Sequence, residues 1–332
     1  MSTDPEAVAN LSSKYGYGQL TDVGKRRSYE LGKSIRRRYD SYLSPQYNKS
    51  EIYIRSTDST RTKMTVLTAM SAVYPAAKDN WSNNINWTPV PYKTVSPIYD
   101  FVTTLNCPVF KTDFEGGLVL PSSKMSTKYS SLLNDLAELT GINFTQTPIM
   151  TYTLHDVYVS QINLGVPVSN KIEALLPELA DAAADSMDIL LGDDSSVNLV
   201  AGVLLNEFFD VANKIIAGED EPKIQIYSAH DVNVYAFTSI TKIANKQGVP
   251  KYASLYSLEL RRVLKTGEYI VVPVYFKEPG VDEIYLQMSG CDGYCTLESF
   301  QNMTSDLVLN EDDWRTLCGF SEDYTFDTSS ID

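Results

Sequence analysis

The segment EIYIRSTD, residues 51–58, indicates a short β-strand that ends abruptly in a polar turn, and a helical pattern follows from residue 60 to residue 73. The same order recurs late in the chain. There, IQIYSAHD, residues 224–231, indicates a strand with a polar exit, and residues 232–244 have a helical pattern. In open α/β sheets ligands lie at the carboxyl ends of strands, where helix N-termini favour anions. The two exits carry Arg55, His230 and Asp231, which are therefore the candidate site residues.

The rest of the chain supplies further helices and a hairpin. Residues 20–43 have a helical apolar spacing behind a Thr21 cap, and three later segments, residues 129–139, 172–191 and 199–216, are also predicted to be helical. Residues 254–263 and 269–276 alternate in polarity, which predicts an antiparallel hairpin and makes the sheet mixed. We predict an α/β fold with a mixed central sheet flanked by helices. Its core comprises residues 1–104 and 201–332, and residues 105–200 form an inserted, mostly helical cap.

Composition excludes several classes of protein. With 332 residues and 43% hydrophobic content, the chain can bury a sizeable core. Its 28 Lys and Arg are outnumbered by 42 Asp and Glu, and the resulting net charge of -14 repels a nucleic-acid backbone. No run of eighteen apolar residues occurs, so no membrane span is predicted. Residues 1–5 lack the basic and apolar regions of a signal peptide.

Cysteines and glycosylation motifs point instead to the secretory route. Four cysteines are present, and Cys291 and Cys295 are close enough to share a tight loop. A zinc site competes with disulfides here, but two histidines and no second close cysteine pair favour disulfides. Six Asn-X-Ser/Thr motifs are candidate N-glycosylation sites. They begin at Asn10, Asn48, Asn80, Asn86, Asn143 and Asn302.

Three segments, taken in order, resemble one enzyme family. They are GYGQLTDVG at residues 16–24, IRSTD at residues 54–58 followed by Arg61 and Thr62, and YSAHD at residues 227–231. This order resembles the histidine acid phosphatases of the lysosomal, prostatic and insect venom branch. The resemblance runs from about residue 3 to about residue 320, and the cysteines also match family positions.

The resemblance implies a fold, a chemistry and a set of roles. The family's fold is an α/β core with a helical cap, and its members hydrolyse phosphate monoesters at acid pH through a phosphohistidine intermediate. Arg55 would then bind the phosphate, His230 would donate to the phosphoryl oxygens, and Asp231 would protonate the leaving group. No cofactor or metal is implied. Such chemistry needs cations around the phosphoryl oxygens and a proton for the departing alkoxide.

The resemblance also implies covalent and cellular features. Two family bridges match Cys107 with Cys318 and Cys291 with Cys295, while a third has no counterpart. Family members are secreted or lysosomal and are frequently dimers, so a homodimer is among the expectations, although no stretch of sequence specifies an interface.

The family's nucleophile motif is missing. Arg-His-Gly-x-Arg-x-Pro, whose histidine is the nucleophile, does not occur in the sequence, and Thr3-Asp4-Pro5 resembles the loop just after it. Only His155 and His230 are present, and we interpret His155 as a polar cap residue. We therefore expect an N-terminally truncated and catalytically impaired acid phosphatase.

The truncation would also remove the first strand, which is expected to be central in the sheet. Its two neighbours would keep unpaired backbone groups, each costing about 1–3 kcal/mol when buried. A domain's whole stability is only about 5–15 kcal/mol. We expect this polypeptide, expressed alone, to be poorly soluble or to aggregate through that exposed edge.

Two other functions are compatible with parts of the sequence. A non-catalytic paralogue could act as a secreted phosphate-ester binding or interaction protein, but it would have no chemical need for the leaving-group acid Asp231. A metal-dependent hydrolase is disfavoured because the sequence has two histidines and no close cluster of histidines and carboxylates of metal-site type.

Overall fold

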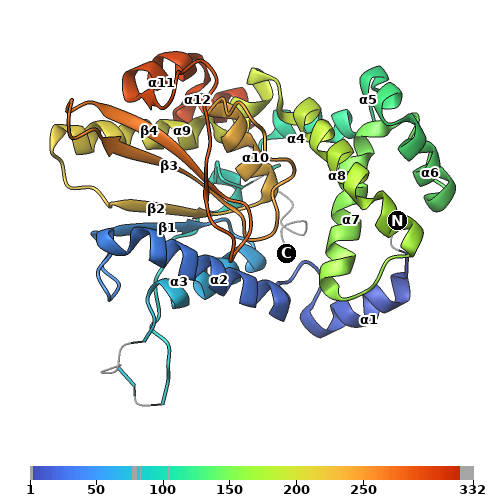
Figure 1. Ribbon diagram of the computed structural model, residues 1–332, viewed down its shortest axis with the longest axis horizontal. Helices are drawn as coiled ribbons and strands as arrows, with labels where there is room; N and C mark the ends of the chain where they lie inside the picture. Colours follow the sequence, from blue (N-terminus) through green and yellow to red (C-terminus); the bar gives the residue numbers. More distant parts are fainter. Residues whose placement is uncertain (1–2, 77–80, 83, 104, 322–332) are drawn as a thin grey trace.

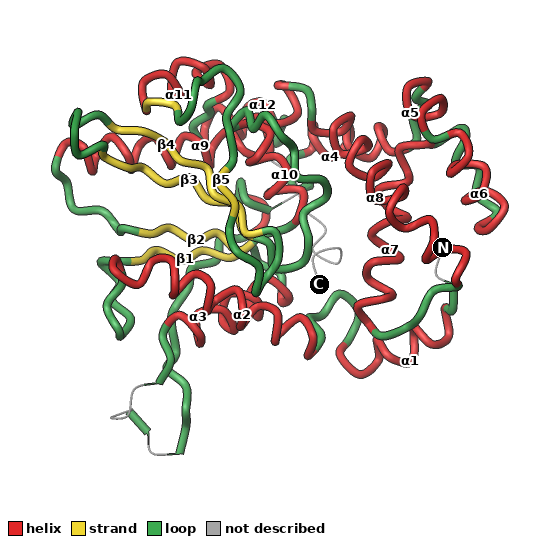
Figure 2. The backbone as a smooth tube through the Cα atoms, viewed as in Figure 1, coloured by secondary structure: helices red, strands yellow, loops and turns green. Residues whose placement is uncertain are grey.

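The computed structural model describes residues 3–76, 81–82, 84–103 and 105–321. Two regions lie side by side, one containing all the labelled strands and the other only helices (Figures 1 and 2). The α/β class predicted from the two strand–turn–helix units is confirmed. None of the helices in the described part of the chain is long and apolar enough to cross a membrane.

The strands form two sheets. The strand β1 (Ile52–Ser56) pairs in parallel with β2 (Ile224–Ser228), with Arg55 opposite Tyr227. The second sheet contains the predicted hairpin, β3 (Leu255–Arg262) and β4 (Tyr269–Phe276), and two short strands that pair with β4, β5 (Ile284–Tyr285) and β6 (Cys295–Thr296). The sequence predicts one mixed sheet, but the structure has two separate sheets. Among the described residues, no strand lies between β2 and β3 and the two do not pair with each other.

Helices cover both sides of β1 and β2. On one side, α2 (Asp22–Tyr39) and α3 (Thr60–Val73) bury Leu31, Ile35 and Val66 against Ile52 and Ile54 (Figure 1). On the other side lie α9 (Asp194–Ala217) and α10 (Asp231–Ile240), which pack together with α11 (Leu297–Thr304) against β4. This three-layer arrangement holds the carboxyl ends of β1 and β2 at one edge.

The helical region has its own apolar core. It contains α5 (Ser123–Lys128), α6 (Ser130–Thr140), α7 (Thr151–Leu164) and the first half of α8 (Asn170–Leu191), packed around Leu132, Leu133 and Leu154. The second half of α8 joins α4 (Pro108–Leu118), α9, α10 and α12 (Glu311–Leu317) in a separate cluster. The cap boundaries at residues 105 and 200 stay a prediction. The remaining helices are α1 (Pro5–Tyr15) and four short 3₁₀ turns, Asp40–Tyr42, Pro97–Tyr99, Pro148–Met150 and Ser305–Leu307.

Local sequence signals explain several element ends. The Thr21 hydroxyl accepts a hydrogen bond of 3.1 Å from the Gly24 N–H and so caps α2, as predicted. Gly141 ends α6 in the left-handed conformation with φ of 74°, a backbone geometry that suits glycine.

Both disulfides implied by the resemblance are present. Cys107 is bonded to Cys318, which ties the start of α4 to the end of α12, and Cys291 is bonded to Cys295 in the loop before β6. No described cysteine is free.

Candidate active site

The first part of the candidate site is the turn between β1 and α3. Thr57 is fully buried, and its hydroxyl lies 2.9 Å from the hydroxyl of Thr62 in the first turn of α3. This bond fixes the turn against the helix, so that the N-terminal end of α3 is held next to the exit of β1. Arg61 lies on the same first turn of the helix.

The exit of β2 brings His230 to the same place. Its Nε2 lies 3.3 Å from the hydroxyl of Thr57, although the two residues are 173 positions apart in sequence. The backbone N–H of His230 donates to the side chain of Asn233 at 3.2 Å, which fixes the start of α10. The two strand exits predicted from sequence are therefore adjacent, because β1 and β2 are parallel neighbours.

Asp231 is the first residue of α10 and contacts the helical region. Its Oδ2 accepts a hydrogen bond of 3.0 Å from the hydroxyl of Tyr152 on α7. Burial raises the pKa of the Asp231 carboxyl, against the opposing effects of the Tyr152 bond, nearby backbone N–H groups and the charge of Arg61. A carboxyl with a raised pKa keeps its proton at mildly acidic pH and can donate it to a leaving group.

Arg61 is the cation that acts on this pair. Burial and the charge of Arg61 lower the pKa of His230 to about 4, so the imidazole is neutral at pH 5 and above. The same charge partly offsets the effect of burial on Asp231, whose pKa is raised overall. Arg61 belongs to the second of the three family-like segments, although no role is implied for it by the resemblance. Its position in the first turn of α3, directly after the exit of β1, is the sequence feature that indicates a place at the site. The first turn of a helix that follows a strand lies beside the end of that strand.

Arg55 lies at the exit of β1, and its role as a phosphate ligand stays a prediction. Its side chain is buried, and Nη2 donates to Oδ1 of the fully buried Asp100 at 2.5 Å. The guanidinium also lies over the ring of Phe101, 4.3 Å from its centroid. Asp100 further accepts a hydrogen bond of 3.1 Å from the backbone N–H of Val102. The pairing with Asp100 engages Nη2 of Arg55, whereas the buried Nε has no hydrogen-bond partner among the described residues.

The Arg55 ion pair is connected to His230 through the loop that holds Asp100. The side chain of Asn233 donates to the carbonyl of Val102 at 3.0 Å, while its oxygen accepts from the backbone of His230. Arg55, Asp100, Val102, Asn233 and His230 therefore form one chain of contacts. Arg55 positions this loop, and through it the start of α10.

Asp156 on α7 is a group that the sequence analysis missed. Burial and the negative charge of Asp231 raise the pKa of Asp156 to about 6, and the positive charge of Arg61 opposes this effect. Part of the Asp156 side chain is exposed to solvent. It is the residue one turn after Tyr152, so both face α10 from the same side of the helix. His155 also lies on α7, and burial lowers its pKa. No hydrogen bond links His155 to the described residues around His230.

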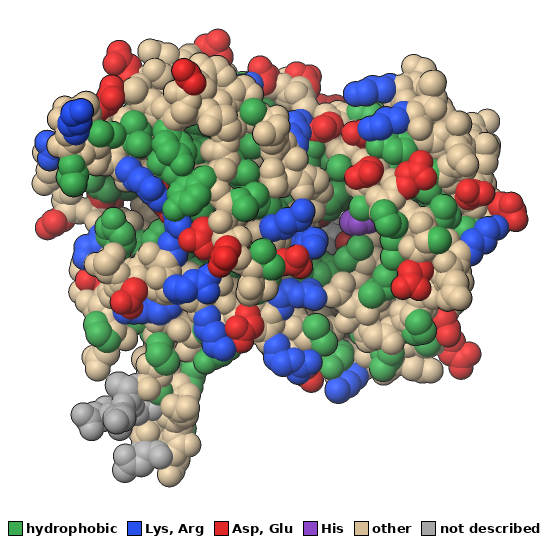
Figure 3. All heavy atoms as spheres, in the orientation of Figure 1, with side chains coloured by type: hydrophobic (Ala, Val, Ile, Leu, Met, Phe, Trp, Pro, Cys, Tyr) green, Lys and Arg blue, Asp and Glu red, His purple; other side chains and the backbone are tan. Residues whose placement is uncertain are grey.

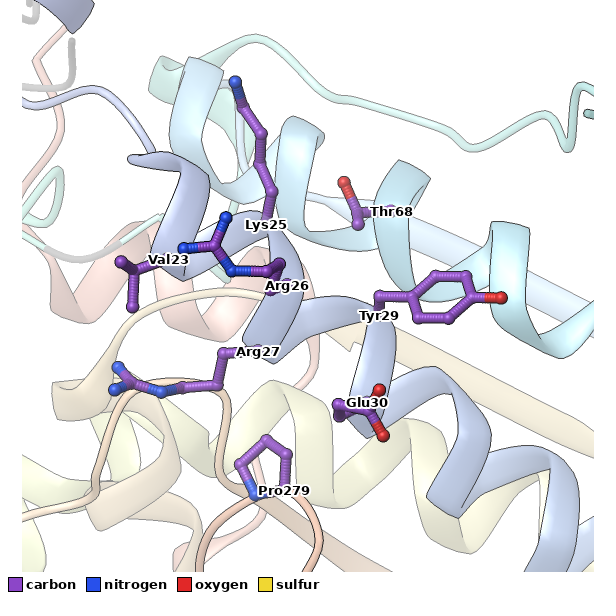
Figure 4. Close-up of a pocket in the computed structure, with 8 residues that line it drawn as sticks. All are labelled: Val23, Lys25, Arg26, Arg27, Tyr29, Glu30, Thr68 and Pro279. Atoms are coloured by element: carbon purple, nitrogen blue, oxygen red, sulfur yellow. The ribbon is translucent and has the colours of Figure 1, made fainter.

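A basic depression lies on the outer surface of α2, away from this site. It has a volume of about 600 Å³ and is lined by Lys25, Arg26 and Arg27, with Thr68 of α3 and Pro279 at its sides (Figure 4). Lys and Arg side chains gather over this part of the face shown in Figure 3, despite the acidic composition. Its lining also includes Glu30 of α2 and contains no histidine.

Two further predictions concern surface and metal sites. Five of the six sequon asparagines are exposed, whereas Asn80 lies outside the described residues. Asn10 and Asn302 are within α1 and α11 rather than in loops. Within the described ranges, no group of three or more His, Cys, Asp or Glu side chains could hold a metal ion.

Comparisons with known proteins agree with the motifs. The profile of the histidine phosphatase superfamily (branch 2) matches residues 5–277. Human prostatic acid phosphatase is 29% identical over 95% of this chain and 82% of its own length. The venom acid phosphatase of Apis mellifera is 27% identical over 89% of this chain and 77% of its own length. The lysosomal acid phosphatase of Xenopus laevis is 29% identical over 91% of this chain and 71% of its own length.

Solved structures show the same fold. The phytase of Hafnia alvei in complex with tartrate superposes with a TM-score of 0.67 at 13% identity, covering 92% of this chain and 90% of its own. The phytase of Citrobacter braakii gives a TM-score of 0.63 with the same identity and coverage. The profile match, the acid phosphatase relatives and the adjacent strand exits lead to one conclusion. The chain belongs to the histidine phosphatase superfamily (branch 2), in its acid phosphatase family.

Proposed function

We propose that the chain binds phosphate monoesters at the two strand exits, with Arg61 and His230 on the phosphoryl group and Asp231 as the leaving-group acid. The observation that carries this proposal is the contact between Thr57 and His230, which joins the exits. It gathers a cation, a neutral imidazole, a carboxyl whose pKa is raised by burial and two helix N-termini at one point. This is the set of groups that an anionic ester with a poor leaving group requires.

Each residue has a separate task in the proposed reaction. Arg61 offsets the negative charge of the equatorial oxygens, and an imidazole N–H of His230 donates to one of them. Asp231 holds a proton at acid pH and passes it to the ester oxygen as the bond to phosphorus breaks. Arg55 would bind the phosphate through Nε, which is buried without a hydrogen-bond partner among the described residues, while its Nη2 is held by Asp100.

The nucleophile is the part that limits the reaction. The family's chemistry forms a bond between a histidine nitrogen and phosphorus while the ester oxygen departs with the proton of the acid. In this sequence only His155 and His230 are available, and His230 is assigned to binding. We propose that these 332 residues are an N-terminally truncated, catalytically impaired form of a secreted or lysosomal acid phosphatase. The two disulfides and the exposed sequons support such a compartment.

A direct assay tests this proposal. With 4-nitrophenyl phosphate at pH 5, we expect no turnover above that of the His230→Ala variant. Joining a segment that contains Arg-His-Gly-x-Arg-x-Pro ahead of Met1 is expected to give turnover that Asp231→Asn then reduces about 10²- to 10⁴-fold. Turnover by the unextended chain that His230→Ala abolishes would show that the nucleophile is already present. Phosphate binding without turnover in the extended chain would favour the non-catalytic binding protein.

A further inference from the structure

One face of α7 is directed at the region that contains the strands (Figure 1). This face carries polar residues at intervals of three or four positions, which places them in one row along the helix. The row consists of Tyr152, Asp156, Ser160 and Asn163. All of its members except Asp156 form hydrogen bonds with the opposite region. The row therefore lies along the boundary between the two regions.

Contacts on both sides hold Asp156 at this boundary. One turn before it, the hydroxyl of Tyr152 donates to Oδ2 of Asp231 at 3.0 Å. One turn after it, the hydroxyl of Ser160 lies 2.8 Å from the hydroxyl of Tyr252, in the segment before β3. The backbone of α7 is thus fixed against the opposite region above and below Asp156, and the direction of its side chain is fixed with it.

The carboxyl of Asp156 has no direct partner. Within the described residues it makes no hydrogen bond and no ion pair, and part of the side chain is exposed to solvent. Charges act on it through space, since Asp231 raises its pKa and Arg61 lowers it. Burial and the charge of Asp156 in turn raise the pKa of Tyr252 to about 12. An unpaired, solvent-accessible carboxyl therefore lies among groups of the candidate site.

The cations near Asp156 have other tasks. Nη2 of Arg27 donates to Oδ1 of Asn163 at 3.0 Å, and its guanidinium lies 6.0 Å from the ring centroid of Tyr252. Asn163 is two turns further along α7, which is about 10 Å from Asp156 along the axis. Arg61 is assigned to the phosphoryl group in the proposed function. A bound phosphate offsets the charge of Arg61, so the charge of Asp156 is then left without a counter-charge.

The position of Asp231 determines where the alcohol part of a substrate would lie. The phosphoryl group is assigned to Arg61 and His230 at the strand exits. An ester oxygen that takes its proton from Asp231 must lie next to that carboxyl, and Asp231 is in contact with α7 through Tyr152. The alcohol part therefore extends from the exits toward α7, where Asp156 is one turn away from this contact.

We propose that Asp156 selects the alcohol part of the substrate, so that the site prefers phosphate monoesters of short amino alcohols. The ammonium group of such an ester would donate to the Asp156 carboxylate in a charge-assisted hydrogen bond, which is about twice as strong as the neutral bond that a hydroxyl could offer. A carboxylate or second phosphate on the alcohol would be repelled instead. This inference rests on the proposed function, because it needs the phosphoryl group at His230 and the alcohol at Asp231.

Two esters of equal size test the proposal. O-phosphoethanolamine and n-propyl phosphate differ in having an ammonium or a methyl group at the same place. Their dissociation constants are measured at pH 7 from the ¹⁵N imidazole resonance of His230, since a carboxyl with a pKa of about 6 is mostly ionised there. We expect O-phosphoethanolamine to bind about threefold more tightly or better, the effect of one solvent-accessible ion pair.

Variants assign this preference to one carboxyl. Asp156→Asn is expected to bring the ratio of the two dissociation constants close to one, and Asp156→Glu, which keeps the charge, is expected to retain part of the preference. Asp181→Asn is the matched control, because Asp181 is an exposed carboxyl on α8 in the same region. It is expected to leave the ratio unchanged.

The outcomes separate this inference from the proposed function. If inorganic phosphate and both esters leave the His230 resonance unmoved, the phosphate site is wrong and the selection by Asp156 falls with it. If inorganic phosphate and n-propyl phosphate bind but the ratio is near one, or the ratio persists in Asp156→Asn, only the role of Asp156 is overturned. Should Asp156→Asn not fold, the ¹³C-labelled carboxyl of Asp156 in the wild-type chain is expected to respond to O-phosphoethanolamine and not to n-propyl phosphate. An equal response to both esters would also overturn the role.

Discussion

Tyr152 of α7 donates a hydrogen bond of 3.0 Å to Asp231, the first residue of α10. The bond joins the helical region to the group proposed as the leaving-group acid. It also orients the carboxyl while burial keeps its pKa raised. The helical region thus contributes to the acid–base properties of the site as well as covering it.

The raised pKa of Asp231 predicts a pH-dependent stability. The ordinary value is 3.8, and a carboxyl whose pKa is higher in the folded state stabilises the fold below 3.8 and loses that effect as pH rises through the folded value. Asn at position 231 does not titrate, so Asp231→Asn removes this loss of stability at higher pH. Urea unfolding is expected to show the variant gaining stability relative to wild type from pH 4 to pH 7, by at most about 1.4 kcal/mol per pH unit. A difference that is constant with pH would contradict the assignment.

His230 is expected to stay neutral under acidic assay conditions. Its pKa of about 4 results from burial and from the charge of Arg61, so Arg61→Gln should raise it. Titration of ¹⁵N-labelled imidazoles by NMR measures this directly. His155 provides the internal control, because burial alone lowers its pKa. An unchanged His230 titration in the variant would mean that Arg61 does not face the imidazole.

Arg55 and Arg61 are expected to differ in their effects on folding. Arg55→Met leaves the fully buried Asp100 without its ion-pair partner, and breaking such a pair costs about 3–5 kcal/mol. Arg61 is only partly buried, in the first turn of α3, so Arg61→Gln is expected to cost less than Arg55→Met. Chemical denaturation of both variants tests the contrast. Equal stabilities would argue that Arg55 has no positioning role.

The two disulfides are expected to contribute unequally. Cys107 and Cys318 are 211 residues apart, and closing so long a loop stabilises by about 5 kcal/mol in the chain-entropy description. Cys291 and Cys295 are separated by 4 residues, which gives about 2 kcal/mol. Denaturation of the two double Cys→Ser variants should rank them in this order. The reverse order would show that strain or residual unfolded structure dominates.

The sequence predicted the strand exits well because their signals are local. The strand at residues 224–228 and the helix at residues 60–73 have the bounds expected from β-branched and apolar spacing. The two strand exits lie side by side because parallel strands end at a common edge of the sheet, but the contact between His230 and Thr57 appears only in the structure.

The roles of the arginines could not be predicted in the same way. Arg55 and Arg61 are both near the first exit, and only the three-dimensional position of Asp100 shows that Nη2 of Arg55 is paired with it. Tyr152 and Asp156 are about 75 residues from Asp231 in sequence, so no spacing rule could bring them to it. The split between β2 and β3 likewise depends on long-range pairing.

Phosphate binding at His230 is the most direct test of the central claim. Inorganic phosphate is titrated at pH 5 into soluble protein with ¹⁵N-labelled histidines, and the imidazole resonances are followed. The account predicts a saturable shift of His230 that weakens at least tenfold in Arg61→Gln and is unchanged in Arg26→Gln, on the exposed face of α2. A His230 resonance that does not respond, or a response that Arg61→Gln leaves intact, would contradict the proposed site.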